Sequence, residues 1–173
     1  MNITFRKLTK DEKDFKKMHN WCRKPFVYEW FEQRILSYKE IVTKYTNKLD
    51  SKKQELLIII CDNKDIGFAQ IYRYDDNMEF KDLESYNNIY EYDLFIGEEE
   101  YLSKGIGKTI VEDINNKIFS KYNADAIILR PFKRNIRAIK CYEKCNFTII
   151  GEYNGTDTLG RPEIINVLLN KKH

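Results

Sequence analysis

Two glycines stand close together in a chain that has few of them. Gly105 and Gly107 are two of only seven glycines among 173 residues, and they lie in the segment Lys104–Thr109. The segment falls between a predicted strand and a predicted helix. Glycines there let the backbone approach a ligand, while free N–H groups at the helix start face an anion. With Lys104 and Lys108 adding positive charge, the pattern indicates a phosphate-binding turn; a tight turn without a ligand is the alternative.

The two better-known phosphate loops do not fit this turn. A Walker A loop requires a glycine five residues before Gly107, and Leu102 occupies that position. The dinucleotide-binding pattern GxGxxG requires a glycine where the chain has Ile110. A P-loop nucleotide-binding protein therefore remains only as an alternative, and it predicts that the chain binds Mg-ATP.

A second segment, Asn135–Phe147, has the pattern of a ligand-binding helix. Asn135 is a good N-cap residue, and Tyr142 follows seven residues later, so the two lie on nearly the same helix face. The small Ala138 lies between them and leaves room for a ligand. Taken alone, Tyr142 is more simply interpreted as an ordinary core aromatic.

Together, the two segments resemble the GNAT acetyltransferase superfamily. Leu102–Gly107 is similar to its acyl-CoA pyrophosphate loop, Q/R-x-x-G-x-G/A, and Asn135–Phe147 to its second CoA-binding segment, N-x-x-A-x-x-x-Y-x-K-x-G-F. Leu102 replaces the usual Gln or Arg. Asn146 replaces the usual Gly, at a position where Asn tolerates a left-handed conformation. The resemblance implies that acetyl-CoA is the co-substrate, that no metal is needed, and that the cofactor-binding residues are Phe95, Ile96, Lys104, Gly105, Ile106, Gly107, Lys108, Thr109, Asn135, Ala138 and Tyr142.

The resemblance narrows to the aminoglycoside 6′-N-acetyltransferases and covers nearly the whole chain. It is carried by His19–Trp21, Val27–Phe31, Ile66–Tyr72, Tyr92–Gly97 and Arg137–Lys144. It implies direct transfer of an acetyl group to a primary amine of a small cationic acceptor, with the 6′-amine of an aminoglycoside as the first choice and antibiotic resistance as the consequence.

Two catalytic roles follow from this resemblance. Asp93 falls where the family has a strand aspartate that accepts the substrate's amine proton, in the pattern I/M-D-Q, with Leu94 in place of the Gln. Tyr142 falls on the tyrosine commonly assigned to protonate the departing CoA thiolate. Backbone N–H groups near Phe95 and Ile96, where the strand parts from its neighbour, would hold the thioester and its developing oxyanion.

Charge is distributed unevenly along the chain. Residues 75 to 100 hold ten acids and one basic residue, Lys81. This segment is either a solvated loop or a rim that attracts a cationic acceptor towards Asp93. The acids are Asp75, Asp76, Glu79, Asp82, Glu84, Glu91, Asp93, Glu98, Glu99 and Glu100. Basic residues near the glycine turn and the second segment would favour the CoA phosphates: Lys104, Lys108, Lys133 and Arg134.

The residues expected to bind the acceptor are Trp30, Tyr72, Glu91, Asp93 and Arg130. Four aromatics are candidates to stack on sugar or amine groups, with core packing as the alternative for each: Trp30, Phe31, Tyr72 and Tyr92. Many aminoglycoside enzymes have Asp-Pro after the strand corresponding to Ala126–Leu129, and that Asp binds the aminoglycoside.

This chain has Arg130-Pro131 at that place. A cation pointing inward would repel a polycation. Three alternatives stay open, and Arg130 favours the first of them. They are a GNAT enzyme for another amine (a polyamine, a peptide N-terminus or a siderophore precursor), a CoA-binding module without turnover, and the P-loop protein.

The pattern of apolar residues and turns predicts the elements that position these residues. Strands are expected over 3–8, 56–61, 66–74, 89–96, 126–129, 147–152 and 164–169, and helices over 38–49, 105–121 and 135–145. A further helix opens at Thr9–Glu12, which has capping-box spacing, and Asp62–Asp65 reads as a hairpin turn. The order of these elements predicts the fold class α/β (α+β) with a mixed central sheet. The family resemblance implies a GNAT fold, in which the sheet is mostly antiparallel, is flanked by helices and has a strand splay at the acetyl-CoA site. Residues 1–173 are expected to form one domain.

Composition excludes several other classes of protein. The chain is 42% hydrophobic, which suffices for a core, and its net charge of +3 is too small to indicate nucleic-acid binding. No apolar run approaches the ~20 residues of a membrane span, and the N-terminal residues lack the apolar region of a signal peptide. Four cysteines without a CxxC pair and two histidines do not suggest zinc and are expected to be free thiols. We expect a cytoplasmic protein, monomer or homodimer.

Overall fold

The computed structural model describes residues 1–75 and 80–172, so Asp76 and Glu79 of the acidic segment lie outside the described residues. Its elements, in chain order, are β1 (Ile3–Lys7), α1 (Glu12–Cys22), α2 (Pro25–Tyr28), α3 (Tyr38–Ser51), β2 (Gln54–Cys61), β3 (Lys64–Arg73), η1 (Lys81–Leu83), β4 (Ile89–Ile96), η2 (Glu99–Tyr101), α4 (Ile106–Lys121), β5 (Ala126–Leu129), α5 (Ile136–Glu143), β6 (Thr148–Thr156) and β7 (Pro162–Lys171). Every predicted strand and helix has its counterpart in this order.

Hydrogen bonds join the described strands in the order β1-β2-β3-β4-β5-β7-β6. Neighbours β1 and β2, β5 and β7, and β6 and β7 are antiparallel, whereas β4 and β5 are parallel. This confirms the predicted mixed, mostly antiparallel sheet. The ladder between β4 and β5 ends where Glu91 faces Ile128, yet β4 runs on to Ile96, so the predicted splay begins after Glu91.

The chain forms two compact units. The first comprises Met1–Ile71 and Asp93–Ile106, and the second comprises Tyr72–Tyr92 and Gly107–His173. Strands β3 and β4 contribute residues to both units. That residues 1–173 act as one domain stays a prediction.

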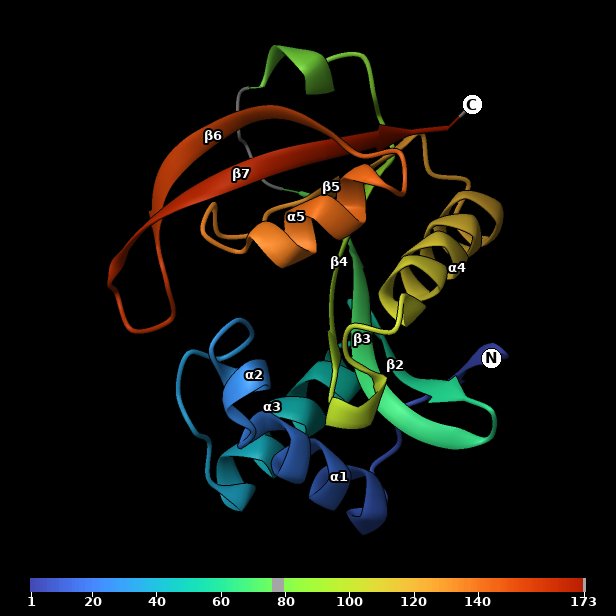
Figure 1. Cartoon of the computed structure of the whole chain (residues 1–173), viewed down its shortest axis with the longest axis vertical. Helices are drawn as coiled ribbons and strands as arrows, with labels where there is room; N and C mark the ends of the chain where they lie inside the picture. The colour runs from blue at the N-terminus through green and yellow to red at the C-terminus, as the bar shows by residue number, and fades with distance from the viewer. Residues whose placement is uncertain (76–79, 173) are drawn as a thin grey trace. The chain divides into compact units, whose positions relative to one another are not determined.

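Aromatic residues build the core of the first unit. Helices α1 and α2 pack against each other, and α3 packs against α1 and β2 (Figure 1). The ring of Phe95 on β4 lies 4.8 Å from Phe31, 5.7 Å from Phe68 and 6.1 Å from Trp21, centroid to centroid. Edge-on and tilted contacts of this kind stabilise aromatic clusters. They anchor β4 to the helical layer beside Asp93.

The start of α1 differs from the prediction. Asp11 is the N-cap residue, and its side chain accepts a hydrogen bond of 2.8 Å from the N–H of Lys13. The hydroxyl of Thr9 donates instead to Asp14. The capping box predicted at Thr9–Glu12 is therefore wrong, because Asp14 draws the Thr9 hydroxyl away from the helix terminus.

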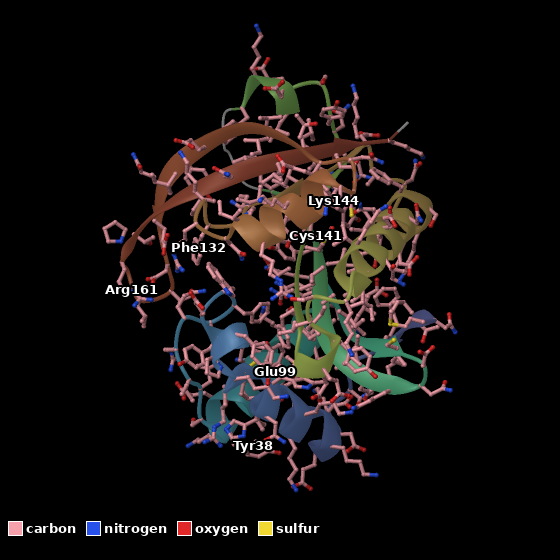
Figure 2. All side chains as sticks on the ribbon, in the orientation of Figure 1. Tyr38, Glu99, Phe132, Cys141, Lys144 and Arg161 are labelled. Atoms are coloured by element: carbon pink, nitrogen blue, oxygen red, sulfur yellow. The ribbon has the colours of Figure 1, made fainter. Side chains whose placement is uncertain are left out.

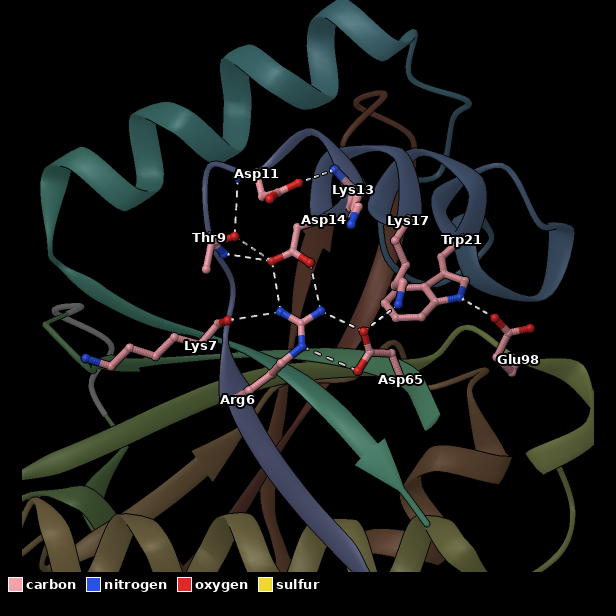
Figure 3. A network of polar contacts seen from close by, with 10 residues as sticks. All are labelled: Arg6, Lys7, Thr9, Asp11, Lys13, Asp14, Lys17, Trp21, Asp65 and Glu98. Carbon is pink, nitrogen blue, oxygen red and sulfur yellow. Dashed lines mark hydrogen bonds and ion pairs between the residues drawn. The ribbon is translucent and has the colours of Figure 1, made fainter. Parts of the chain in front are cut away.

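A network of charged groups joins β1, α1 and β3 (Figure 3). The guanidinium of Arg6 donates two hydrogen bonds to Asp14, at 2.9 and 2.7 Å, and two to Asp65, at 2.6 and 3.4 Å. Lys17 adds a second ion pair to Asp65. The Asp14 side chain is only 7% exposed and that of Asp65 16%. Both carboxylates are thus held inside the protein by cations from other elements.

Helices α4 and α5 flank the strands of the second unit. Ile110, Ile114 and Ile118 of α4 are fully buried, and their spacing of four residues places them along one face of the helix. Figure 2 shows Cys141 on α5 and Phe132 in the loop that leads to it. Phe132 forms an isolated β-bridge with Ile165 of β7. The loop before α5 is thereby tied to the sheet.

The four cysteines are free thiols, as predicted: Cys22, Cys61 and Cys145 are buried and Cys141 is half-buried. Burial raises the pKa of Cys22 and of Cys145 to about 12. Within residues 1–75 and 80–172, no His, Cys, Asp and Glu side chains gather as a metal site would require. None of the described helices combines the length and the apolar character that crossing a membrane demands.

Candidate active site

A chain of hydrogen bonds ends on Asp93 in the first unit. Asp93 is half-buried on β4, and its Oδ2 accepts a hydrogen bond of 2.7 Å from Nε2 of Gln70 on β3. Oε1 of Gln70 in turn accepts a hydrogen bond of 2.6 Å from Nζ of Lys48 on α3. Sequence reasoning missed both partners, because 22 and 23 residues separate the members of each pair.

The electrostatic surroundings of Lys48 include two acids and a second lysine. The pKa of Lys48 is lowered to about 8, first by burial and then by the nearby charge of Lys44, while Asp93 and Glu32 act in the opposite direction. Glu32 is buried and forms an ion pair with Lys44. The four charges sum to zero, so the half-buried cluster carries no net charge at neutral pH.

Beyond Asp93, the strand β4 is fixed by a close backbone contact. Because the ring of Phe95 is committed to the core, only its backbone can serve the predicted thioester-binding role. A Cβ at Gly67 of β3 would lie 2.3 Å from the carbonyl oxygen of Phe95. Gly67 is therefore required for β3 and β4 to approach here. In the sequence, Ile66–Tyr72 contributed only to the family resemblance, and nothing in it indicated this close contact at Gly67.

We predict that Gly67→Ala displaces β4 at Phe95. The methyl group would overlap a backbone atom that cannot rotate away, and overpacking of this kind costs about 1–3 kcal/mol. The melting midpoint should fall, and acetyl-CoA should bind more weakly. Thermal unfolding and calorimetric titration with acetyl-CoA measure the two effects. A variant with the wild-type melting midpoint would contradict the close contact.

The glycine turn has the geometry that an anion site needs. Gly105 has φ 77° and Ser103 has φ 61°, and α4 begins at Ile106. Nothing lies within 4 Å of a Cβ built at Gly105, so this glycine is needed for its backbone conformation. Lys104 is exposed, as is Lys108, whose Nζ lies 3.5 Å from Glu112. The unpaired N–H groups at the start of this 16-residue helix fit the pyrophosphate of an acyl-CoA.

The second segment forms α5 as expected. Asn135 is its N-cap, and its side chain accepts a hydrogen bond of 3.2 Å from the N–H of Ala138. Tyr142 is half-buried, with its ring centroid 5.9 Å from that of Phe147. Asn146 has φ 68°, which confirms the predicted left-handed conformation.

The glycine turn meets α5 within the second unit. A Cβ built at Gly107 would lie 3.5 Å from Sγ of Cys141, an ordinary van der Waals contact. The thiol of Cys145 also reaches the carbonyl oxygen of Lys108, at 3.7 Å. The start of α4 and the C-terminal end of α5 are thus neighbours. The predicted cofactor-binding residues of this unit are Gly107, Lys108, Thr109, Asn135, Ala138 and Tyr142.

Arg130 and Glu91 form a bidentate ion pair in the second unit. Nε and one terminal nitrogen of Arg130 donate to the two carboxylate oxygens of Glu91, at 2.8 and 2.7 Å. The Glu91 side chain is 4% exposed, and the Arg130 guanidinium also lies over the ring of Tyr74. The charge of Arg130 is therefore neutralised by a residue that the sequence suggested as an acceptor-binding group in its own right.

The other acceptor-binding candidates differ in burial. Trp30, just after α2, and Tyr72, on β3, are half-buried. Tyr92 is 2% exposed, and its hydroxyl lies 3.1 Å from Oδ1 of the buried Asn115. Phe31 packs on Phe95. The stacking role suggested for Tyr92 is wrong, because its ring is buried in the core.

Ion pairs offset part of the predicted charge asymmetry. In the acidic segment, Glu98 pairs with Lys24, and Glu100 with Lys64. Among the basic residues expected near the CoA phosphates, Lys133 pairs with Glu152 and Arg134 with Glu163. In the described part of the segment, four further acids are exposed to solvent: Asp75, Asp82, Glu84 and Glu99.

The predicted residues thus fall into two sets. Asp93, Phe95 and Ile96 lie on β4, in its part that belongs to the first unit. The first unit also contains Trp30, Lys104, Gly105 and Ile106. The remainder of the cofactor-binding set belongs to the second unit, as do Tyr72, Glu91 and Arg130.

Comparison with known proteins identifies the family. The model of the acetyltransferase (GNAT) domain matches residues 10–154. The aminoglycoside N(6′)-acetyltransferases type 1 of Klebsiella pneumoniae and of Serratia marcescens are each 25% identical over 161 residues, covering 91% of this chain and 77% of theirs.

Solved structures confirm the fold. An aminoglycoside acetyltransferase in complex with coenzyme A and kanamycin superposes with a TM-score of 0.80 at 22% identity, covering 99% of this chain and 95% of that one. Spermidine N-acetyltransferase of Vibrio cholerae, in complex with CoA and spermine, gives a TM-score of 0.77 at 19% identity over 98% and 95% of the two chains. The chain belongs to the GNAT acetyltransferase family, and it is an N-acetyltransferase that uses acetyl-CoA as co-substrate.

Proposed function

We propose that this enzyme acetylates the 6′-amine of an aminoglycoside and thereby confers resistance to that antibiotic. The observation that carries the proposal is the similarity to two aminoglycoside N(6′)-acetyltransferases along 91% of the chain. The acidic segment supports it, because exposed carboxylates draw a polycationic acceptor towards the protein.

Asp93 is the proposed general base. A protonated amine cannot attack a carbonyl, so its proton must leave first, directly to the Asp93 carboxylate or through water. The acceptor nitrogen then bonds to the acetyl carbon as the C–S bond of the thioester breaks, and the nitrogen releases its second proton to water as the amide forms. Backbone N–H groups near Phe95 and Ile96 stabilise the oxygen that becomes negative. Acetyl-CoA supplies the activated acetyl group.

Tyr142 is the proposed general acid, because the departing thiolate needs a proton. We predict that Tyr142→Phe lowers kcat by roughly 10²-fold with little change in acetyl-CoA affinity, since only the hydroxyl is lost. Steady-state kinetics and calorimetric titration measure these quantities. Tyr86→Phe removes a hydroxyl elsewhere in the second unit and should leave both unchanged. An undiminished kcat in Tyr142→Phe would exclude it as the acid.

A matched pair of antibiotics tests the acceptor. Neomycin and paromomycin differ by an amine or a hydroxyl at the 6′ position. We expect the enzyme to convert neomycin into a product one acetyl group heavier and to leave paromomycin unmodified at that ring. Tandem mass spectrometry of the products locates the acetyl group. Equal acetylation of both antibiotics would place the reaction on a different amine.

A polyamine is the second candidate acceptor. Arg130 stands where many aminoglycoside enzymes have a substrate-binding aspartate, and its pairing with Glu91 leaves no net negative charge on that pair. The absence of this aspartate favours an acceptor that does not need it, such as a linear amine. Acetylation of spermidine at a higher kcat/KM than neomycin would select this alternative.

We propose that residues 1–173 act as one acetyltransferase domain in the cytoplasm, as a monomer or homodimer. Four free cysteines agree with a reducing compartment.

A further inference from the structure

Lys48 and Gln70 lie next to the proposed base but have no part in the mechanism described above. Gln70 is 7% exposed, and both ends of its amide are hydrogen-bonded, to Lys48 at 2.6 Å and to Asp93 at 2.7 Å. A buried amide with both ends bonded is held rigidly, because turning it over would break two hydrogen bonds.

The two neighbours determine which way the amide points. A lysine ammonium can only donate hydrogen bonds, and an aspartate carboxylate can only accept them. Oε1 of Gln70 must therefore face Lys48, and Nε2 must face Asp93. The charge on Lys48 thus sets the direction of the hydrogen bond that Asp93 receives.

We propose that Lys48, acting through Gln70, is a positioning residue that holds the carboxylate of Asp93 in the orientation needed to accept the amine proton. This inference rests on the proposed role of Asp93. A base whose orientation is fixed by a third group is a recurring arrangement in catalysis, and misplacement by about 1 Å can cost roughly 10²-fold in rate.

The inference predicts a pH dependence. Below about pH 8 the Lys48 ammonium donates, and the amide keeps its direction. Above it the neutral amine can also accept, so Gln70 is free to turn and to present Oε1 to the carboxylate. Glu32 and Lys44 also face Lys48, but their ion pair leaves their combined charge at zero. As pH rises above about 8, the Asp93 carboxylate should lose its fixed orientation, and kcat should fall.

The test compares kcat across the pH range in the full-length enzyme with acetyl-CoA and neomycin. Lys48→Met and Gln70→Leu should each lower kcat roughly tenfold or more, with KM for acetyl-CoA unchanged. Lys48→Arg should retain activity, and the ratio of wild-type to Lys48→Arg kcat should decline above about pH 8, because arginine stays charged. Lys39→Met, an exposed change on the same helix, should match the wild type.

The outcomes separate this inference from the proposed function. Wild-type kcat in a folded Lys48→Met variant, or a constant ratio across the pH range, would overturn the positioning role and leave the acetyl transfer intact. If no amine is acetylated by the wild type, both fail. Should Lys48→Met lower the melting midpoint, Lys48→Gln, which keeps a polar group there, provides the comparison of kcat.

Discussion

Replacing Asp93 by Asn should lower kcat by roughly 10²–10⁴-fold near neutral pH, the range that general base catalysis contributes. Asn keeps an oxygen that can accept the hydrogen bond from Gln70 Nε2, so the local structure should persist. It cannot take a proton. The loss should therefore be largest at low pH, where most of the acceptor amine is protonated, and should shrink as pH approaches the pKa of that amine. A pH profile of kcat measures this.

The matched control removes a charge from the same acidic segment without touching the proposed base. Glu99 is exposed on η2 (Figure 2), and Glu99→Gln makes the same change in net charge as Asp93→Asn. We expect its kcat to equal the wild type, with at most a small rise in KM for the cationic acceptor. A wild-type kcat in Asp93→Asn at every pH would contradict the role of Asp93 as general base. Equal losses of kcat in Asp93→Asn and Glu99→Gln would mean that the loss comes from the change in net charge and not from the missing base.

Replacing Arg6 by Met should have the largest effect on stability. The variant leaves the 7% exposed Asp14 without its cation, while Asp65 keeps only Lys17. Removing one partner of a buried ion pair costs about 3–5 kcal/mol, and we expect the lower end here because Arg6 is one-third exposed. The melting midpoint should fall by roughly 6–12 °C. Differential scanning calorimetry provides the measurement.

Lowering the pH should reduce the free energy of unfolding less in Arg6→Met than in the wild type. Burial by itself would raise the pKa of Asp14 and of Asp65. The hydrogen bonds and charge of Arg6, together with Thr9 at Asp14 and Lys17 at Asp65, outweigh burial and hold both pKa values below the ordinary 3.8. A lowered pKa contributes stability above the unfolded value, and that stability is lost as pH falls through the folded value. The difference in stability between wild type and Arg6→Met should therefore narrow below about pH 4.

An exposed ion pair supplies the control for Arg6. Lys10 and Asp50 lie 2.5 Å apart with more than half of each side chain exposed, so Lys10→Met should cost less than about 1 kcal/mol. Equal losses of stability in Lys10→Met and Arg6→Met would contradict the account of a buried network.

The elements whose bounds the sequence predicted best are β4, β5 and α4. Strand β4 has the predicted bounds, and α4 differs by one residue, because its apolar stripe repeats at helical spacing. Strand β6 runs to Thr156, four residues beyond the predicted end at 152. In the strand, Gly151 makes room for the ring of Phe80, 2.7 Å from where a Cβ would be.

The partners of the site residues were harder to predict, because they come from distant positions. Nothing local links Lys48 to Gln70, or Gln70 to Asp93. The ion pair of Glu91 and Arg130 could have been inferred from the pairing of the predicted strands. Parallel strands place Glu91 opposite Ile128, and Arg130, two residues on, continues the same face. Considered separately, Glu91 suggested part of an acidic rim that attracts a cationic acceptor, and Arg130 suggested a cation that repels it.

The most direct test of the account is the mass of the acceptor after reaction. Kanamycin incubated with acetyl-CoA and the wild-type enzyme should become one acetyl group heavier, with one equivalent of free CoA thiol released per product. The same incubation with Asp93→Asn should yield far less of both. Thiol release without an acetylated amine, or unmodified kanamycin beside acetylated spermidine, would contradict the proposed transfer to an aminoglycoside.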